Sequence, residues 1–127
     1  MSFRQSFRAT PIALTLVAVI TAAFAVSAFA GPTTGKAEAG AAIYKTKCVA
    51  CHKADGTGGF KVAGLPTANW TLKKTWDATR TDDYLRDCIT NGKIKDGMVA
   101  WGKTKQLTPA QIEDLVAYIK TYKAKAK

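Results

Sequence analysis

The stretch KCVACHK, residues 47–53, places the single histidine of the chain directly after two cysteines that are three positions apart. In a helical turn, side chains at positions i and i+3 lie on the same side of the helix. The sulfurs of Cys48 and Cys51 should therefore project to one face, with the imidazole of His52 presented from that face. Three kinds of site use such residues: a structural zinc site, a redox-active dithiol, and covalently attached haem.

The first two kinds of site find little support in the rest of the sequence. A structural zinc site needs four ligands, usually in two separated pairs, and Cys88 is the one cysteine left over. Its place on the apolar side of a predicted helix favours burial, although a leftover thiol in an oxidising compartment can also form an intermolecular disulfide. A thioredoxin-like dithiol expects a βαβ context, and the sequence has no alternating strand pattern.

Haem attachment accounts for more of the pattern. The spacing C-x-x-C-H is the signature of c-type haem, in which both thiols add across the vinyl groups of the porphyrin and the histidine binds the iron. The chain after residue 30 has 97 residues, a size at which a domain is marginally stable without help. A large, flat, apolar cofactor would provide that help.

The first thirty residues are predicted to be a cleavable signal peptide. Residues 1–10 are polar and carry two arginines, residues 12–26 are almost wholly apolar, and Ala28-Phe29-Ala30 is a small-x-small cleavage site. An uncleaved membrane anchor is the alternative, because the apolar run is nearly long enough to span a bilayer. We expect a signal peptide at 1–30 and one domain at 31–127, exported to the periplasm and without stable membrane insertion after cleavage.

The mature segment is strongly basic. Seventeen of the 19 Lys and Arg residues and all nine acidic residues follow residue 30, which gives the segment a net charge of +8. Such a charge favours an acidic partner. Nucleic acid is not the expected partner, because the sequence has no nucleic-acid-binding motif.

The mature segment is predicted to be all-α, with a long irregular middle. Helices are expected from about Lys36 to Lys47 with Thr34 as the cap, from Thr81-Asp82-Asp83 to Asn91-Gly92, and from Thr108-Pro109 to about Tyr122. Residues 53–80 should be mostly loop, since they contain several glycine turn signals. The expected apolar faces are Ala39, Ile43 and Tyr44 in the first helix, Tyr84, Leu85, Cys88 and Ile89 in the second, and Ile112, Leu115, Val116 and Ile119 in the last.

With these motifs in place, the chain resembles the small soluble class I cytochromes c, which are single-haem electron carriers. The resemblance covers nearly all of residues 35–122. It rests on the haem signature and on Gly40 and Tyr44, which lie eight and four residues before Cys48. In the family, a glycine and an aromatic residue at these places cross the last helix, where Leu115 and Tyr118 would be their counterparts. The implied fold is the cytochrome c fold, with three to five helices around one covalently attached haem.

The resemblance also implies a second axial ligand for the iron. Met98 is the one methionine after residue 30, and it lies in GMVAWG, residues 97–102. The family places its ligand methionine shortly before the last helix, often with an aromatic residue three positions on, as Trp101 is here. Val99 stands where the family often has proline. Ordinary core packing is the alternative role for Met98.

Further expectations concern the surroundings of the haem. A proline carbonyl in the loop after the signature accepts a hydrogen bond from the ligand histidine in the family, and Pro66 is the candidate for His52. Trp70 is a candidate donor to a haem propionate, while Trp70 and Trp76 could instead be wall residues.

Together these features predict a periplasmic, monomeric, single-haem c-type cytochrome without enzymatic activity. Cys48 and Cys51 would hold one haem c by thioether bonds, and His52 and Met98 would be its axial ligands. It would carry one electron between a donor and an acceptor redox protein with acidic docking surfaces. The alternatives are a haem subunit of a larger dehydrogenase or oxidase complex, and an enzyme or gas sensor with an open haem site.

Overall fold

A computed structural model describes residues 34–127, and the predicted signal peptide at 1–30 lies outside these residues. Within them the chain forms four α-helices: α1 (Ala37–Lys47), α2 (Val49–His52), α3 (Asp82–Asn91) and α4 (Pro109–Lys123). Two single-turn 3₁₀ helices, η1 (Lys73–Thr75) and η2 (Ile94–Asp96), interrupt the loops. The described part has isolated antiparallel bridges but no β-strand, so the all-α prediction is confirmed.

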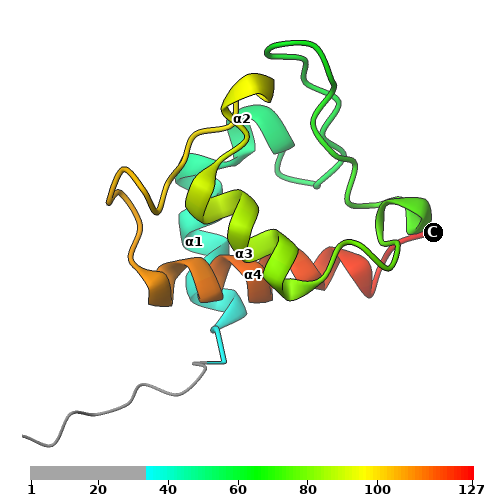
Figure 1. Cartoon of the computed structure of the whole chain (residues 1–127). Coiled ribbons are helices and arrows are strands. Elements are labelled where there is room, and N and C mark those ends of the chain that lie inside the picture. The colour runs from blue at the N-terminus through cyan, green and yellow to red at the C-terminus, as the bar shows by residue number, and fades with distance from the viewer. Residues whose placement is uncertain (1–33) are drawn as a thin grey trace, which may run out of the picture.

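Helix α1 crosses α4, and α3 also packs against α4 (Figure 1). The crossing depends on Gly40, where the two backbones meet. Next to it, the ring of Tyr44 packs on that of Tyr118 with centroids 5.1 Å apart, and Leu115 is completely buried beneath them. The predicted contact between the first and last helices is therefore present.

The ends of α3 and α4 follow the predicted capping signals. Thr81 accepts a hydrogen bond from the backbone N–H of Tyr84, and Gly92 ends α3 with a positive φ of 68°. At α4, the N-cap Thr108 and the third helical residue Gln111 form a reciprocal capping box, and Pro109 is the first helical residue. Such caps stabilise a helix by about 1 kcal/mol, because they satisfy backbone groups that have no partner inside the helix.

The start of α1 differs from the prediction. The N-cap residue is Lys36 rather than Thr34, and its side chain makes no capping hydrogen bond. The backbone N–H of Lys36 instead donates to Asp114 Oδ1 of α4, at 2.7 Å. Tyr44 is buried and Ile43 packs against the core as predicted, but Ala39 is exposed and Gly40 is buried in its place.

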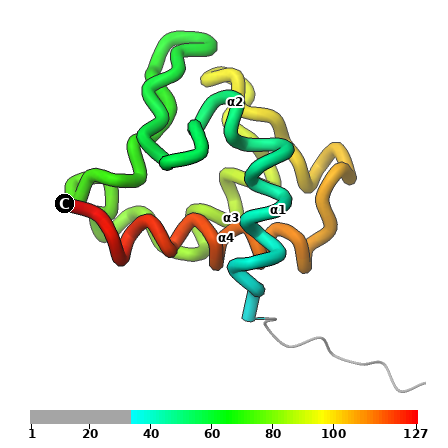
Figure 2. Tube along the Cα trace, turned by 180° about the vertical axis from the view of Figure 1, so that it is seen from behind, coloured from blue at the N-terminus to red at the C-terminus, as the bar shows by residue number. Residues whose placement is uncertain are grey.

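The buried apolar faces of α3 and α4 agree with the predicted ones. Leu85, Cys88 and Ile89 of α3 are buried, as are all four predicted residues of α4, while Tyr84 is partly buried. Seen from behind, the segment between α2 and α3 runs as a long loop above the helices (Figure 2). Among residues 34–127 no helix is both long and apolar enough to cross a membrane.

Candidate functional site

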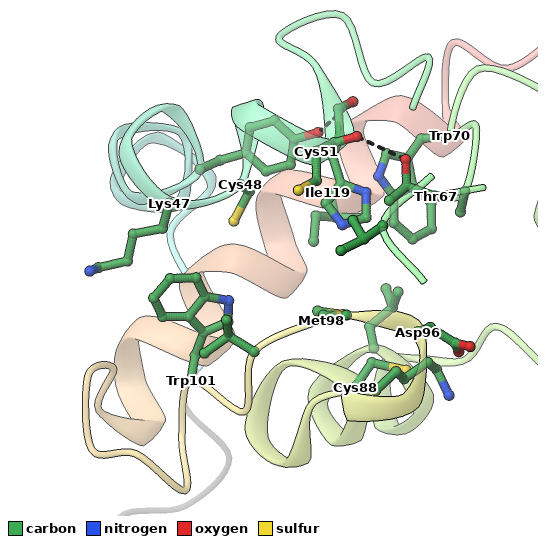
Figure 3. Close-up of a pocket in the computed structure, with 18 of the residues that line it drawn as sticks. Lys47, Cys48, Cys51, Thr67, Trp70, Cys88, Asp96, Met98, Trp101 and Ile119 are labelled. Atoms are coloured by element: carbon green, nitrogen blue, oxygen red, sulfur yellow. Dashed lines mark hydrogen bonds between the residues drawn. The ribbon is translucent and has the colours of Figure 1, made fainter. Parts of the chain in front are cut away.

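A cavity of about 360 Å³ opens between α2, α3 and the loop that follows η2. Its walls carry the side chains of Cys48, Cys51 and His52 on one side and Met98 on the other, and all four line the same space. In Figure 3 the side chains of Cys48, directly before α2, and Cys51, within α2, lie on one side of the cavity, and Met98 lies across it. The structure therefore brings together all four residues that the sequence singled out.

Helix α2 is fixed by hydrogen bonds to its carbonyl groups. The Tyr44 hydroxyl donates to the carbonyl of Lys53 at 3.0 Å, and the Thr67 hydroxyl donates to that of Cys51 at 2.8 Å. Lys53 ends the helix with a φ of +58°, and its own N–H donates to the carbonyl of Val49. The last carbonyls of a helix lack partners within it, so these two hydroxyls hold the cysteine-bearing turn against the core.

The Cys48 thiol lacks the lowered pKa that a redox-active dithiol uses. Cys48, Cys51 and Cys88 are all free, and burial raises the pKa of the Cys48 thiol to about 11. A reactive dithiol needs a lowered pKa, because the thiolate is the nucleophile. Within the described residues, no three His, Cys, Asp or Glu side chains group closely enough to hold a metal ion, so a structural zinc site has no ligand set there.

Met98 is positioned by a tight turn that encloses η2. Lys93 and Met98 exchange two backbone hydrogen bonds, of 3.1 and 3.0 Å, which close the loop into a small antiparallel bridge. Gly92, directly before the bridge, and Gly97, inside the turn that it closes, have φ angles of 68° and 80°, values that favour glycine. The bridge holds the thioether on the cavity wall that faces α2.

His52 has one nitrogen that lacks a partner. Burial lowers its pKa, which favours the neutral imidazole that binds metals. Its Nδ1 is buried and has no hydrogen-bond partner. The expected acceptor, the carbonyl of Pro66, is therefore not in place, because Pro66 instead lies in a bridge with Lys61 at the exposed end of the loop.

Trp70 is the second residue with an unsatisfied buried group. Its side chain is 6% exposed, lines the cavity, and has an indole N–H without an acceptor. An unpaired buried donor costs about 1–3 kcal/mol, so an acceptor within the cavity would stabilise the fold. The guanidinium of Arg80 lies 5.8 Å from the Trp70 ring centroid and 5.5 Å from that of Tyr84, and it also lines the cavity.

These groups fit a porphyrin. Two thiols and an imidazole on one wall match the attachment of a c-type haem and one axial ligand, and the thioether opposite matches the second axial ligand. Trp70 N–H and Arg80 match the carboxylates at a porphyrin edge. The remaining wall is apolar and includes Leu85, Cys88, Trp101 and Ile119.

Sequence reasoning missed two residues of the site. Thr67 and Arg80 lie in the long loop, where no helical periodicity indicates which side chains turn inward. For Arg80, the one available signal was an arginine directly before the Thr81 cap of a helix whose apolar face lines the cavity. For Thr67 we find no local signal, because its partner is 16 residues earlier.

Comparisons with known proteins agree with this geometry. A family model described as cytochrome c oxidase, cbb3-type, subunit III matches residues 35–119. A solved structure titled "KustC0563 c-type cytochrome" superposes with a TM-score of 0.55 at 24% sequence identity, covering 69% of this chain and 98% of that one. At this identity the similarity shows the cytochrome c fold. No curated protein matches the chain.

The family match spans well over half of the chain, and it contains the haem signature, α1, α3, the methionine loop and most of α4. The chain therefore belongs to the c-type cytochrome family described as cytochrome c oxidase, cbb3-type, subunit III, whose members are electron carriers with covalently attached haem.

Proposed function

We propose that the chain is a periplasmic, single-haem c-type cytochrome that carries one electron at a time between redox proteins. Cys48 and Cys51 form the thioether bonds to one haem c, and His52 and Met98 are its axial ligands. One observation carries the proposal: the two thiols and the imidazole share a cavity wall, and the single methionine of the described residues faces them.

Haem, when bound, supplies a one-electron couple whose potential depends on its axial ligands and on burial. The chain determines how that couple behaves. The turn of α2 fixes the imidazole of His52, and the bridge between Lys93 and Met98 fixes the thioether. With both ligands held by backbone structure, little has to move when the charge of the site changes.

Ligation of the iron from both sides distinguishes an electron carrier from a haem enzyme. A substrate, oxygen or peroxide needs a free coordination position, and Met98 removes it. Tyr44 and Ile119 line the cavity and are only 2% and 6% exposed, so the cavity reaches into the apolar core. No side chain of the cavity has to donate or accept a proton for this function.

The cavity mouth is suited to brief contacts with an acidic protein. Val62 and Leu65 belong to the mouth and are 48% and 70% exposed. Lys47 and Lys93 lie at the same mouth, together with the acid Asp96. Apolar residues surrounded by positive charge give fast, electrostatically guided association with modest affinity, and contacts between transient redox partners are generally smaller than about 1,200 Å².

Export is part of the proposal, with residues 1–30 as its cleavable signal. Covalent haem attachment then takes place outside the cytoplasm. N-terminal sequencing of the haem-loaded protein from the periplasmic fraction tests this part, with Gly31 as the expected first residue. A haem-loaded protein that keeps residues 1–30 in the membrane fraction would contradict it.

The haem assignment is tested by mass spectrometry of a proteolytic digest. The peptide that contains residues 48–52 should carry the mass of one haem, and the substitution of both cysteines by alanine should abolish it. Replacement of Cys88 by alanine is the matched control and should leave the haem peptide unchanged. Attachment through Cys88 instead of Cys48 or Cys51 would contradict the assignment.

A second candidate is a haem subunit of a larger oxidase or dehydrogenase complex. The description of the family, which names a cytochrome c oxidase subunit, favours it. The same four residues would act, but the chain would remain bound to a catalytic partner. Size-exclusion chromatography of the native protein distinguishes the two, since the carrier should elute as a free monomer and the subunit as part of a large assembly.

A further inference from the structure

Three aromatic rings connect the inner wall of the cavity to a different part of the surface. The imidazole of His52 stacks on the indole of Trp70, with centroids 5.8 Å apart and planes 26° apart. Trp70 in turn packs against Trp76, with centroids 5.4 Å apart. Trp76 is partly exposed and does not line the cavity, so the series of rings leads away from the cavity mouth.

The contact between the two tryptophans is a fixed one. The indole N–H of Trp76 donates to the backbone carbonyl of Trp70 at 2.7 Å, and both rings pack in or against the main apolar core. A hydrogen bond and packing together hold the rings at one separation. Such a contact persists, whereas a chance approach of two mobile surface side chains would not.

The surface around Trp76 is basic, and the end of the chain contributes to it. The backbone N–H of Lys73 donates to the carbonyl of Lys127 at 2.9 Å, and that of Lys127 donates to the carbonyl of Thr71 at 3.0 Å. Both cartoon views show this end beside the segment that contains η1 (Figures 1 and 2). Lys123 Nζ lies 6.0 Å from the centroid of the Trp76 ring. We call this surface the Trp76 face, formed by Leu72, Lys73, Lys74, Trp76, Lys123 and Lys127.

The Trp76 face has the composition of a docking surface for an acidic protein. Its lysines are exposed, and Leu72 adds an apolar side chain that is 37% exposed. Asp77 is the one acid of residues 71–80. The backbone N–H and the hydroxyl of Thr79 both donate hydrogen bonds to its Oδ1. Clustered positive charge beside an aromatic residue favours a partner with a negative surface.

The geometry points to a second electron-transfer route, which runs from His52 through Trp70 and Trp76 to an acidic redox protein docked on the Trp76 face. This inference rests on the proposed haem ligation. One electron crosses to the one-electron acceptor of the partner, so that the cytochrome is oxidised as the partner is reduced. No bond forms or breaks and no proton moves, because the rings act only as a packed medium for tunnelling.

A consequence is that donor and acceptor need not share one surface. The cavity mouth, with Val62 and Leu65, can hold one partner while the Trp76 face holds the other. Because tunnelling weakens steeply across unfilled gaps, Trp76 matters for the second partner and not for the first.

The test uses the full haem-loaded protein with a ruthenium photoreductant attached to one introduced cysteine. The label is placed at Lys74→Cys on the Trp76 face, or at the control position Lys95→Cys near the cavity mouth. Cys88 is only 7% exposed and should stay unlabelled. In each background, the rate of flash-induced electron transfer to the haem is compared for the wild-type ring, Trp76→Phe and Trp76→Leu.

We expect Trp76→Leu to slow transfer from position 74 several-fold, Trp76→Phe to slow it less, and both to leave transfer from position 95 unchanged. Equal rates in all three proteins at position 74, or equal slowing from both positions, would overturn the route. If Trp76→Leu does not fold, the comparison of Trp76→Phe with the wild-type protein still tests the route. The visible spectrum of each protein is recorded first, so a failure of haem ligation is recognised separately.

The docking surface is tested with hexacyanochromate, a redox-inert paramagnetic anion that broadens the NMR signals of nearby amides. We expect broadening of residues 72–76 and 123–127, and its loss in the double variant Lys73→Glu, Lys74→Glu. Broadening confined to the cavity mouth would overturn the assignment of this surface.

Discussion

A methyl group on Gly40 would lie 2.0 Å from the carbonyl oxygen of Asp114. The two residues lie where the backbones of α1 and α4 meet, and α2, the turn with the proposed haem ligand His52, directly follows α1. Because the obstacle is backbone, it cannot be relieved by a side-chain rotation. The position of the site therefore depends on the absence of one side chain.

Gly40→Ala should destabilise the protein despite the higher helix propensity of alanine. Alanine gains up to about 1 kcal/mol within a helix, but overpacking at a rigid contact costs about 1–3 kcal/mol, and here the backbones must separate. Urea denaturation of the haem-loaded protein measures the net loss. Ala39→Ser, which adds one heavy atom at the exposed neighbouring position, is the control and should change stability by less than about 0.7 kcal/mol. Equal stability of Gly40→Ala and wild type would disprove the close contact.

Met98→Ala should lower the reduction potential and open the iron to external ligands. The thioether favours the ferrous state, and exchange of axial ligands changes haem potentials within a range of about 0.8 V. Potentiometric titration and carbon monoxide binding to the reduced protein measure the two effects. Ile94→Ala is the control, since Ile94 is 68% exposed and does not line the cavity. Rapid carbon monoxide binding by the wild type at neutral pH would contradict ligation by Met98.

Glu113→Gln should weaken the link between α3 and α4 in a pH-dependent way. Arg86 donates to both carboxylate oxygens of Glu113 and lowers the pKa of that carboxyl. A lowered pKa in the folded state means that the contribution is present above the ordinary pKa of glutamate and is lost as pH falls through the folded value. The pair is partly exposed, so the expected loss at pH 7 is at most about 1 kcal/mol.

Denaturant unfolding at pH 7 and in acid, below the lowered pKa, measures the effect of Glu113→Gln. The wild type and the variant should differ at pH 7 and converge in acid. Glu38→Gln, at an exposed position of α1, is the matched control and should differ little from wild type at either pH. A constant difference across the pH range would indicate a packing effect instead of an ionic one.

Reversal of charge at the cavity mouth should slow electron transfer to an acidic partner. Lys61 lies exposed in the loop that carries Val62 and Leu65. With an acidic blue-copper protein as the oxidant, the rate for the wild type should fall steeply as salt is added, because the Debye length is only about 10 Å at 0.1 M. Lys61→Glu should lower the rate at low salt more than Lys36→Glu, at the start of α1. A flat salt dependence would contradict electrostatic steering.

Local signals in the sequence were sufficient for much of the fold. The caps at Thr81 and Thr108 were predictable because each bonds to a residue three positions away. The cap of α1 was not, because the group that satisfies Lys36 comes from Asp114, 78 residues later. The haem signature was readable because its two cysteines and histidine are contiguous.

Features that depend on long-range packing could not be read in the same way. The bridge between Lys93 and Met98 depends on glycines with positive φ, whose conformation a sequence does not specify. The unpaired Nδ1 of His52 and the position of Pro66 follow from the path of the long loop, which has no periodicity. The stacking of His52, Trp70 and Trp76 depends on how that loop folds back over the core, which no local pattern in the sequence indicates.

The most direct test of the central claim is the visible absorption spectrum of the native protein, matured where haem can be attached and recorded in both redox states, followed by acid extraction of a second sample. We predict that the red pigment stays with the polypeptide and shows the sharp bands of a low-spin c-type haem when reduced. A colourless protein, or haem that acid extraction removes completely, would contradict the account.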